Sequence, residues 1–287
     1  MSVADADPAK QPRPLGRGGS ELVLRVASAL VLAPLAIAAA YFGGWPFAIF
    51  WSVAAVIVFW EWTSLVAGED RRAILMLGGA ALVLSLALAG SGRLTGTFVV
   101  IVMGLMGIAP LTPARRRAWV AGAVPYAGAI GIAPMVLRSD TEYGFVAVLF
   151  LFAVVWGTDI VAYFVGRMIG GPKLLPRVSP NKTWSGGIGG LAGAVIAAIA
   201  IAKMAGLAGW FAVAATAAIL SAFAQAGDLF ESLLKRRFGA KNSSRLIPGH
   251  GGLMDRLDGF VVAAAVAALI GILRGGIEAP ARGLLVW

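Results

Sequence analysis

The sequence lacks cysteine and contains few charged residues. Without a cysteine among its 287 residues, the chain can form neither a disulfide bond nor a cysteine-ligated metal site. Only 13% of the residues are charged, whereas soluble domains carry about a quarter. Hydrophobic residues make up 59%, which is more apolar surface than a soluble core of this length can bury. The composition therefore indicates an integral membrane protein.

Apolar stretches recur along the chain at lengths that suit membrane-spanning helices. Each is close to the ~20 residues that a helix needs to cross ~30 Å of hydrocarbon. The stretches are continuous rather than alternating, which favours helices over a barrel. They fall at about 26–44, 46–66, 73–90, 94–111, 118–137, 143–166, 186–207, 209–230 and 259–276. We therefore expect an all-α, polytopic membrane helix bundle with about nine transmembrane helices.

The basic residues support this helix count and predict an orientation. With nine spans, 19 of the 24 lysines and arginines fall on one side of the membrane and 5 on the other. Lysine and arginine are retained on the cytoplasmic side, so we expect a cytoplasmic N-terminus and an external C-terminus. Because the net charge of +10 is spread between apolar segments, we attribute it to topology and to anionic lipids. We do not expect nucleic acid binding.

The N-terminal region differs from the rest of the chain in composition. Residues 1–24 are rich in proline, glycine and small polar residues, which predicts a mobile cytoplasmic tail ahead of one integral-membrane domain, 25–287. A signal peptide over 25–40 is an alternative, because Ala38-Ala39-Ala40 resembles a cleavage site. The apolar run continues beyond it, and the charge alternation requires a span here. We therefore favour a membrane span.

Polar residues gather at the end of the sixth predicted span. Asp159 lies within the span, on the helix face that also carries Tyr163, and an ionisable residue at such a depth is a functional candidate. Further on, Ser179, Lys182 and Thr183 come just before the next helix, where free backbone N–H groups attract phosphate. A buried polar pair and a capped turn are the structural alternatives. The spacing of a P-loop is absent.

A longer polar stretch joins the eighth and ninth predicted spans. Four of its side chains share one helix face, at spacings of three and four residues: Asp228, Glu231, Ser232 and Lys235. Asp255 and Asp258 share another face, after a glycine-rich turn. Carboxylates suit Mg²⁺, which binds through one or two of them plus substrate phosphates, and basic side chains suit the remaining phosphate charge. The alternative is a set of membrane anchors paired with acids.

The same stretch carries a long motif without gaps. It runs Ser232-x-Leu234-Lys235-Arg236, then Lys241 and Ser244, then Ile247-Pro248-x-His250-Gly251-Gly252-Leu253-x-Asp255-Arg256-Leu257-Asp258. This motif closely resembles the signature of the phosphatidate cytidylyltransferase family. The stretch from Asp159 to Gly187 resembles that family's upstream region, and Glu61-Trp62 is also similar. The resemblance covers the C-terminal half in detail and the remainder only in helix layout.

The resemblance implies an activity and a set of site residues. The activity is transfer of CMP from CTP to phosphatidic acid with release of pyrophosphate, using Mg²⁺, with a second cation left open. The residues that it implies as catalytic are Asp228, Asp255, Lys235, Arg256 and Asp258, of which Asp228 and Asp255 match the family's metal-binding aspartates. Those that it implies for substrate binding are Ser179, Lys182, Thr183, Ser232, Arg236, Lys241, His250, Gly251, Gly252 and Asp159. We expect a multi-pass protein of a bacterial-type inner membrane whose active site faces the cytoplasm, with a homodimer left open.

His250 is the only histidine in the chain, which invites its assignment as a general base. The phosphate that would attack is already ionised, so the reaction needs no strong base. Catalysis would then consist mostly of positioning and charge neutralisation. We expect His250 to hydrogen-bond within the glycine-rich turn, or to contact nucleotide or phosphate.

Three positions depart from the family pattern. Asn242 stands where the family has aspartate, Asn181 replaces a lysine, and Ser185 replaces an acid. The missing carboxylate argues against a metal role at position 242, while Lys182 remains in the phosphate loop.

Three other activities are alternatives to CMP transfer from CTP to phosphatidic acid. A CDP-alcohol phosphotransferase is disfavoured, because its D-G-x-x-A-R run is absent. A related CTP-dependent lipid kinase or cytidylyltransferase with another lipid acceptor stays open. So does a polytopic transporter that uses Asp159 and Glu61.

Overall fold

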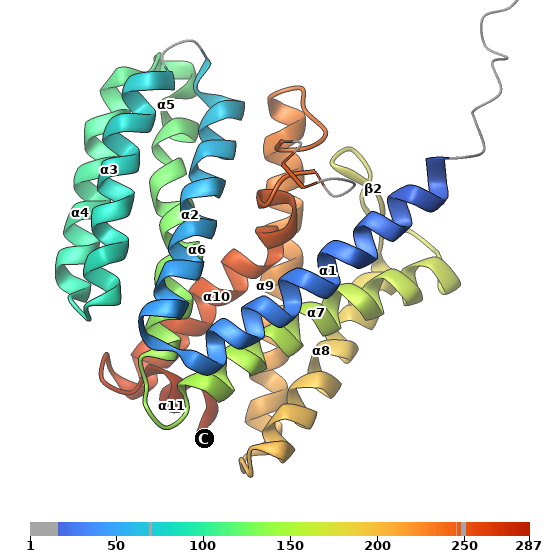
Figure 1. Ribbon diagram of the computed structural model, residues 1–287. Helices are drawn as coiled ribbons and strands as arrows, with labels where there is room; N and C mark the ends of the chain where they lie inside the picture. The colour runs from blue at the N-terminus through green and yellow to red at the C-terminus, as the bar shows by residue number, and fades with distance from the viewer. Residues whose placement is uncertain (1–16, 69–70, 245, 248–250) are drawn as a thin grey trace, which may run out of the picture.

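The computed structural model describes residues 17–68, 71–244, 246–247 and 251–287, with side chains from Leu30 onward. The chain is a bundle of helices with one small hairpin (Figure 1). The elements are α1 (Arg17–Phe42), α2 (Gly44–Val66), α3 (Arg71–Gly90), α4 (Leu94–Ile108), η2 (Ala109–Leu111), α5 (Ala114–Ala121), α6 (Ala123–Arg138), α7 (Gly144–Ile169), β1 (Lys173–Leu175), β2 (Ser179–Thr183), α8 (Trp184–Met204), α9 (Trp210–Arg237), α10 (Met254–Gly275) and α11 (Pro280–Leu285). The predicted all-α membrane bundle is confirmed.

Eight segments of the described chain are long and apolar enough to cross a membrane. They coincide with eight of the nine predicted spans, and α5 and α6 together form one of them, Ala114–Arg138. The first predicted span falls on α1. Within the part of α1 whose side chains are described, Leu30–Phe42 forms an apolar helix that is shorter than the eight spans. Figure 1 shows α1 running obliquely across the bundle, and its C-terminal end lies beside the start of α7, where the rings of Tyr41 and Phe145 are 5.8 Å apart. Residues 1–16 of the predicted tail lie outside the described part of the chain.

The connections between helices alternate between the two ends of the bundle (Figure 1). The α2–α3, α4–α5, α7–α8 and α9–α10 connections lie at one end, and the sequence gives this end most of its basic residues. The α1–α2, α3–α4, α6–α7 and α8–α9 connections lie at the other. This arrangement is the one that the charge asymmetry predicts.

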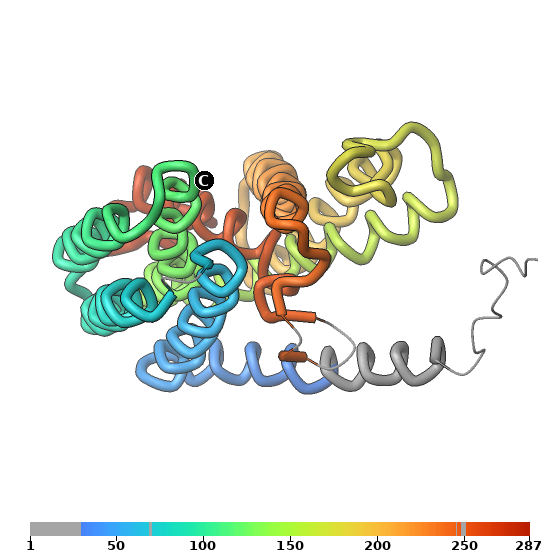
Figure 2. The backbone as a smooth tube through the Cα atoms, turned by 90° about the horizontal axis from the view of Figure 1, so that it is seen from above, coloured from blue at the N-terminus to red at the C-terminus, as the bar shows by residue number. Residues whose placement is uncertain are grey.

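Seen from above, α9 and α10 lie between two groups of helices (Figure 2). On one side, the rings of Trp51 on α2 and Phe260 on α10 stack with centroids 4.7 Å apart. On the other, the Gln225 side chain donates to the Gly187 carbonyl oxygen at 3.2 Å and so joins α9 to α8. The two central helices are therefore held from both sides.

The short β1–β2 hairpin fills the connection between α7 and α8. Its two strands are antiparallel, with Lys173 opposite Thr183. Thr183 ends β2 and is the N-cap of α8, because its hydroxyl accepts a hydrogen bond from the Gly186 N–H at 3.1 Å. The capped turn proposed as the structural alternative for this loop is therefore present.

Candidate functional site

α9 and α10 cross at two glycines. A Cβ atom on Gly227 would lie 2.5 Å from the Asp258 carbonyl oxygen, and one on Gly259 would lie 2.9 Å from the Ala224 carbonyl oxygen. Larger residues would push the helices apart, since membrane helices approach this closely only through small residues. The crossing brings together Asp228 and Asp258, the sequence neighbours of these glycines, and the charge of Asp228 acts on Asp258.

Lys235 lies between two carboxylates. Its Nζ atom is 2.5 Å from Glu231 Oε2, one helical turn away on α9, and 2.7 Å from Asp255 Oδ1 on α10. Glu231 is fully buried, and the Lys235 side chain is only 13% exposed. A buried lysine between two acids is held in place by both, because either acid left alone would be an unpaired buried charge. The predicted shared face of α9 is confirmed.

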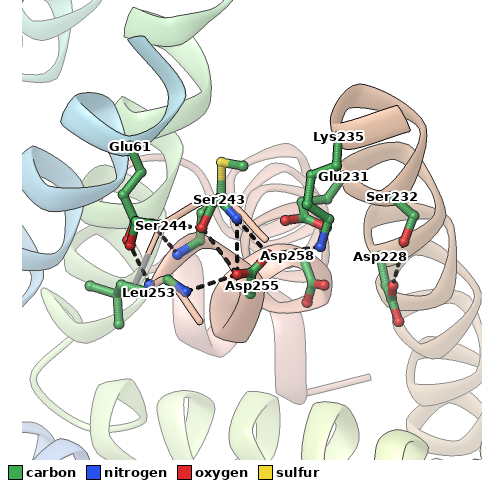
Figure 3. Close-up of polar contacts among 12 residues, drawn as sticks. Glu61, Asp228, Glu231, Ser232, Lys235, Ser243, Ser244, Leu253, Asp255 and Asp258 are labelled. Carbon is green, nitrogen blue, oxygen red and sulfur yellow. Dashed lines mark hydrogen bonds and ion pairs between the residues drawn. The ribbon is translucent and has the colours of Figure 1, made fainter. Parts of the chain in front are cut away.

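The carboxylate of Asp255 also organises the loop between α9 and α10 (Figure 3). Its Oδ2 atom accepts from the Gly252 N–H at 2.8 Å and from the Ser243 N–H at 3.1 Å. Gly251 has a φ of +85°, and a Cβ atom there would lie 2.5 Å from Asp255 Oδ2. A Cβ atom on Gly252 would collide with Ser243. The two glycines are therefore required by the close approach of the protein's own polar side chains.

Glu61, near the end of α2, holds the same loop from the opposite side. It is completely buried. Its Oε1 atom accepts from the Ser244 hydroxyl at 2.6 Å and from the Leu253 N–H at 2.9 Å. Its Oε2 atom accepts from the Met254 N–H at 2.7 Å, at the start of α10, and lies 3.2 Å from the Ser243 hydroxyl. In Figure 3, Glu61 and Asp255 face the loop from its two sides.

Lys182 on the β1–β2 hairpin joins the two regions that the sequence presents separately. Its ammonium forms an ion pair with Asp228 on α9, and both side chains are about one-third exposed or less. Asp228 is also 3.5 Å from the Ser232 hydroxyl, one turn further along α9. The hairpin and the acidic face of α9 therefore belong to one site.

Asp159 on α7 completes the group of acids. It is near enough to Asp228, Lys182 and Arg256 for their charges to act on it. Its side chain is exposed in the isolated chain, as is that of Arg256. On the same helix, Arg167, one turn beyond Tyr163, donates to the Tyr163 hydroxyl at 2.9 Å.

The remaining predicted residues are distributed around this centre. Ser232 and Ser179 are half-buried, while Arg236 and Lys241 are exposed. His250 lies outside the described residues, so its predicted contacts stay predictions. Within the part of the chain that is described, no three Asp, Glu or His side chains meet closely enough to hold a metal ion by themselves. A cation bound here would need ligands from the substrate as well.

The sequence did not predict that Glu61 holds the loop between α9 and α10; it offered Glu61 a role only in the transporter alternative. Glu61 is separated by more than 180 positions from the serines that it binds. The available signals were its position as a lone acid at the end of an apolar span and the similarity of Glu61-Trp62 to the family. Neither signal identifies its partners.

Two comparisons with known proteins agree with the motif. A model of the cytidylyltransferase family matches residues 23–273. A protein of Brucella abortus named phosphatidate cytidylyltransferase is 42% identical over 257 residues, which cover 88% of this chain and 94% of that protein. A protein of the same name from Staphylococcus saprophyticus is 44% identical over 134 residues, or 46% of this chain and 51% of that protein.

Proposed function

Since the chain belongs to the cytidylyltransferase family, we propose that it transfers CMP from CTP to phosphatidic acid, giving CDP-diacylglycerol and pyrophosphate. The similarity to the Brucella protein over most of both chains supports this choice of substrates. The structural observation that carries the proposal is the Lys182–Asp228 ion pair, because it joins a phosphate-type loop to a cluster of acids. A reaction between two phosphate-bearing substrates needs both features in one place.

In the proposed reaction, a phosphate oxygen of phosphatidic acid attacks the α-phosphorus of CTP. The new oxygen–phosphorus bond forms as the bond to the β-phosphate oxygen breaks, and pyrophosphate leaves with those electrons. The attacking oxygen is already ionised, so no side chain has to remove a proton. The protein's contribution is to align the reactants and to neutralise charge.

The basic residues of the site have different proposed tasks. Lys182 and Arg256 lie near Asp159 and Asp228 and can bind phosphate oxygens of the substrates. Lys235 is held by Glu231 and Asp255, so it positions Asp255 and does not bind phosphate directly. The exposed Arg236 and Lys241 attract the anionic substrates to this end of the protein.

The acids of the site fit a divalent cation. Asp228 and Asp255 come from adjacent helices, and Asp258 and Asp159 add negative charge near Asp228. The two carboxylates are paired with Lys182 and Lys235 in this structure, so a bound cation would take the place of one of these ammonium contacts. Mg²⁺ usually takes one or two carboxylates together with substrate phosphates. We propose that Asp228 and Asp255 hold Mg²⁺, which when bound would neutralise charge on the triphosphate.

We also propose that the protein lies in a bacterial inner membrane and that its site faces the cytoplasm. The end of the bundle that carries the site also carries most of the basic residues, and such residues are retained on the cytoplasmic side. CTP is a soluble, highly charged substrate, so the water-facing end of the bundle is where it can enter.

The experiment that tests the function uses purified protein in neutral detergent. CTP, phosphatidic acid and Mg²⁺ are supplied together, and pyrophosphate and CDP-lipid are measured. We expect equal amounts of both products, and neither product when the lipid is omitted. Pyrophosphate release that is independent of the lipid would contradict the proposal. Diacylglycerol in place of phosphatidic acid tests a different lipid acceptor.

A further inference from the structure

A cavity lies at the same end of the bundle, outside the group of residues described above. It has a volume of about 390 Å³ and is lined by Arg115, Arg116, Trp119, Arg237 and Phe238. We call it the arginine pocket. Two of its arginines come from the first turn of α5, and the third ends α9. Segments more than 100 residues apart in sequence therefore build one strongly basic hollow.

None of the described residues that line the arginine pocket is an acid. The ion pairs found among the described residues involve Lys182 and Lys235, and none involves an arginine of the pocket. Arg115 and Arg237 are exposed, and Arg116 makes a long 3.4 Å contact with the Val66 carbonyl oxygen. Three guanidinium groups around one cavity favour an anionic ligand, and their planar donor sets suit phosphate.

Trp119 and Phe238 form the aromatic wall of the pocket, and neighbouring side chains hold this wall in place. Trp119 packs edge to face against Phe238, with centroids 6.0 Å apart, and stacks on Phe230 at 6.3 Å. The Trp62 indole N–H donates to the Trp119 carbonyl oxygen at 2.7 Å. The wall is thus tied to α2 and α9, so a ligand would meet a pre-formed surface.

The helix geometry separates the arginine pocket from the acids of the proposed active site. Arg237 and Asp228 are nine positions apart on α9, which at 3.6 residues per turn places them on opposite faces. Arg237 and Phe230 are seven positions apart and share a face, the one that meets Trp119. The pocket therefore opens on the side of α9 that faces α5 and α6.

The level of the pocket in the bundle indicates the source of the anion. The apolar span Leu94–Leu111 ends just before Arg115, and the span Trp210–Arg237 ends at the pocket itself. Arginine and tryptophan at the ends of spans lie where the hydrocarbon meets the lipid headgroups. We propose that the arginine pocket binds the phosphate headgroup of an anionic membrane phospholipid, separately from the two substrates.

Lipid binding to the full chain in neutral detergent tests this proposal. Native mass spectrometry would follow titrations with phosphatidylglycerol and with phosphatidylcholine, whose headgroup has no net charge. We expect the wild-type chain to prefer phosphatidylglycerol. Arg115→Gln with Arg237→Gln should weaken that binding by about tenfold or more, the size expected from one lost charge-assisted contact. Arg117→Gln is the matched control, because Arg117 is an exposed arginine of α5 that does not line the pocket.

Competition with soluble anions distinguishes a lipid headgroup from a free phosphate as the ligand of the arginine pocket. Inorganic phosphate or CTP that displaces phosphatidylglycerol at equal concentration would overturn the assignment to a lipid. So would phosphatidylglycerol binding by the double variant that equals that of the wild type. If the double variant does not fold, Arg237→Gln alone is compared with Arg117→Gln. None of these measurements requires turnover, so their failure is distinguishable from failure of the proposed reaction.

Discussion

Glu61 is the residue whose replacement tests the geometry of the site most sharply. Its two carboxylate oxygens accept from two backbone N–H groups, one of Leu253 and one of Met254, and both contact serine hydroxyls of the loop. In Glu61→Gln the side chain keeps its shape, but one oxygen becomes an NH₂ group. Whichever way the amide is oriented, one of the two backbone N–H groups loses its acceptor.

The expected effect follows from that single loss. A buried donor left without a partner costs about 1–3 kcal/mol. We expect this cost to destabilise the ordered conformation of the loop that binds Asp255. The helices should keep their packing, because other contacts hold them. On that basis kcat/KM should fall by about 5- to 150-fold, while the unfolding temperature changes little.

The assay is steady-state CDP-lipid formation with purified variants, together with a thermal unfolding curve for each. Glu278→Gln is the matched control, since Glu278 is an exposed glutamate in the connection between α10 and α11, away from the α9–α10 loop. Ser244→Ala removes the shortest contact to Glu61. Combined with Glu61→Gln, it should add less than the sum of the single effects, because the two residues act together. A Glu61→Gln variant with normal kcat/KM would refute the positioning role.

Three further changes test other parts of the site. Lys182→Ala removes a phosphate contact of about 1.5–3 kcal/mol, so KM should rise more than kcat falls; unchanged kinetics for both substrates would reduce the hairpin to a structural cap. Asp228→Asn and Asp255→Asn should each abolish nearly all turnover while the protein stays folded. Both variants should also bind Mn²⁺ more weakly, as measured by electron paramagnetic resonance. Normal turnover and normal Mn²⁺ binding in both variants would contradict the metal assignment. A cysteine at Thr141 should react with impermeant thiol reagents from outside, and one at the exposed Asn242 only from the cytoplasm; the reverse pattern would invert the topology.

The membrane-spanning layout could be predicted from the sequence because lipid imposes a simple rule. A helix must present about 20 apolar residues to the bilayer, and eight of the predicted stretches do so in the structure. The ends of the helices were less predictable. The eighth span was expected to end near residue 230, but α9 continues to Arg237, because a helix that leaves the membrane can carry polar residues into water. This extension keeps Glu231 and Lys235 on the same helix as Asp228, as their spacing predicted.

The site could be predicted in part. The motif identified Asp228, Lys235 and Asp255, and helical spacing gave the shared face of α9. The sequence did not predict that Lys182 pairs with Asp228, because that contact depends on how α7, α8 and α9 pack. It also gave no partner for Glu61, since nothing local marks an acid that will bind a loop formed far along the chain.

The proposed reaction transfers CMP, and not the terminal phosphate, from CTP to the lipid. Purified protein supplied with phosphatidic acid and with CTP labelled in either the α- or the γ-phosphate tests it most directly. We expect the α-label to enter the lipid and the γ-label to leave in pyrophosphate. Recovery of the γ-label in the lipid would contradict this reaction and would identify a lipid kinase instead.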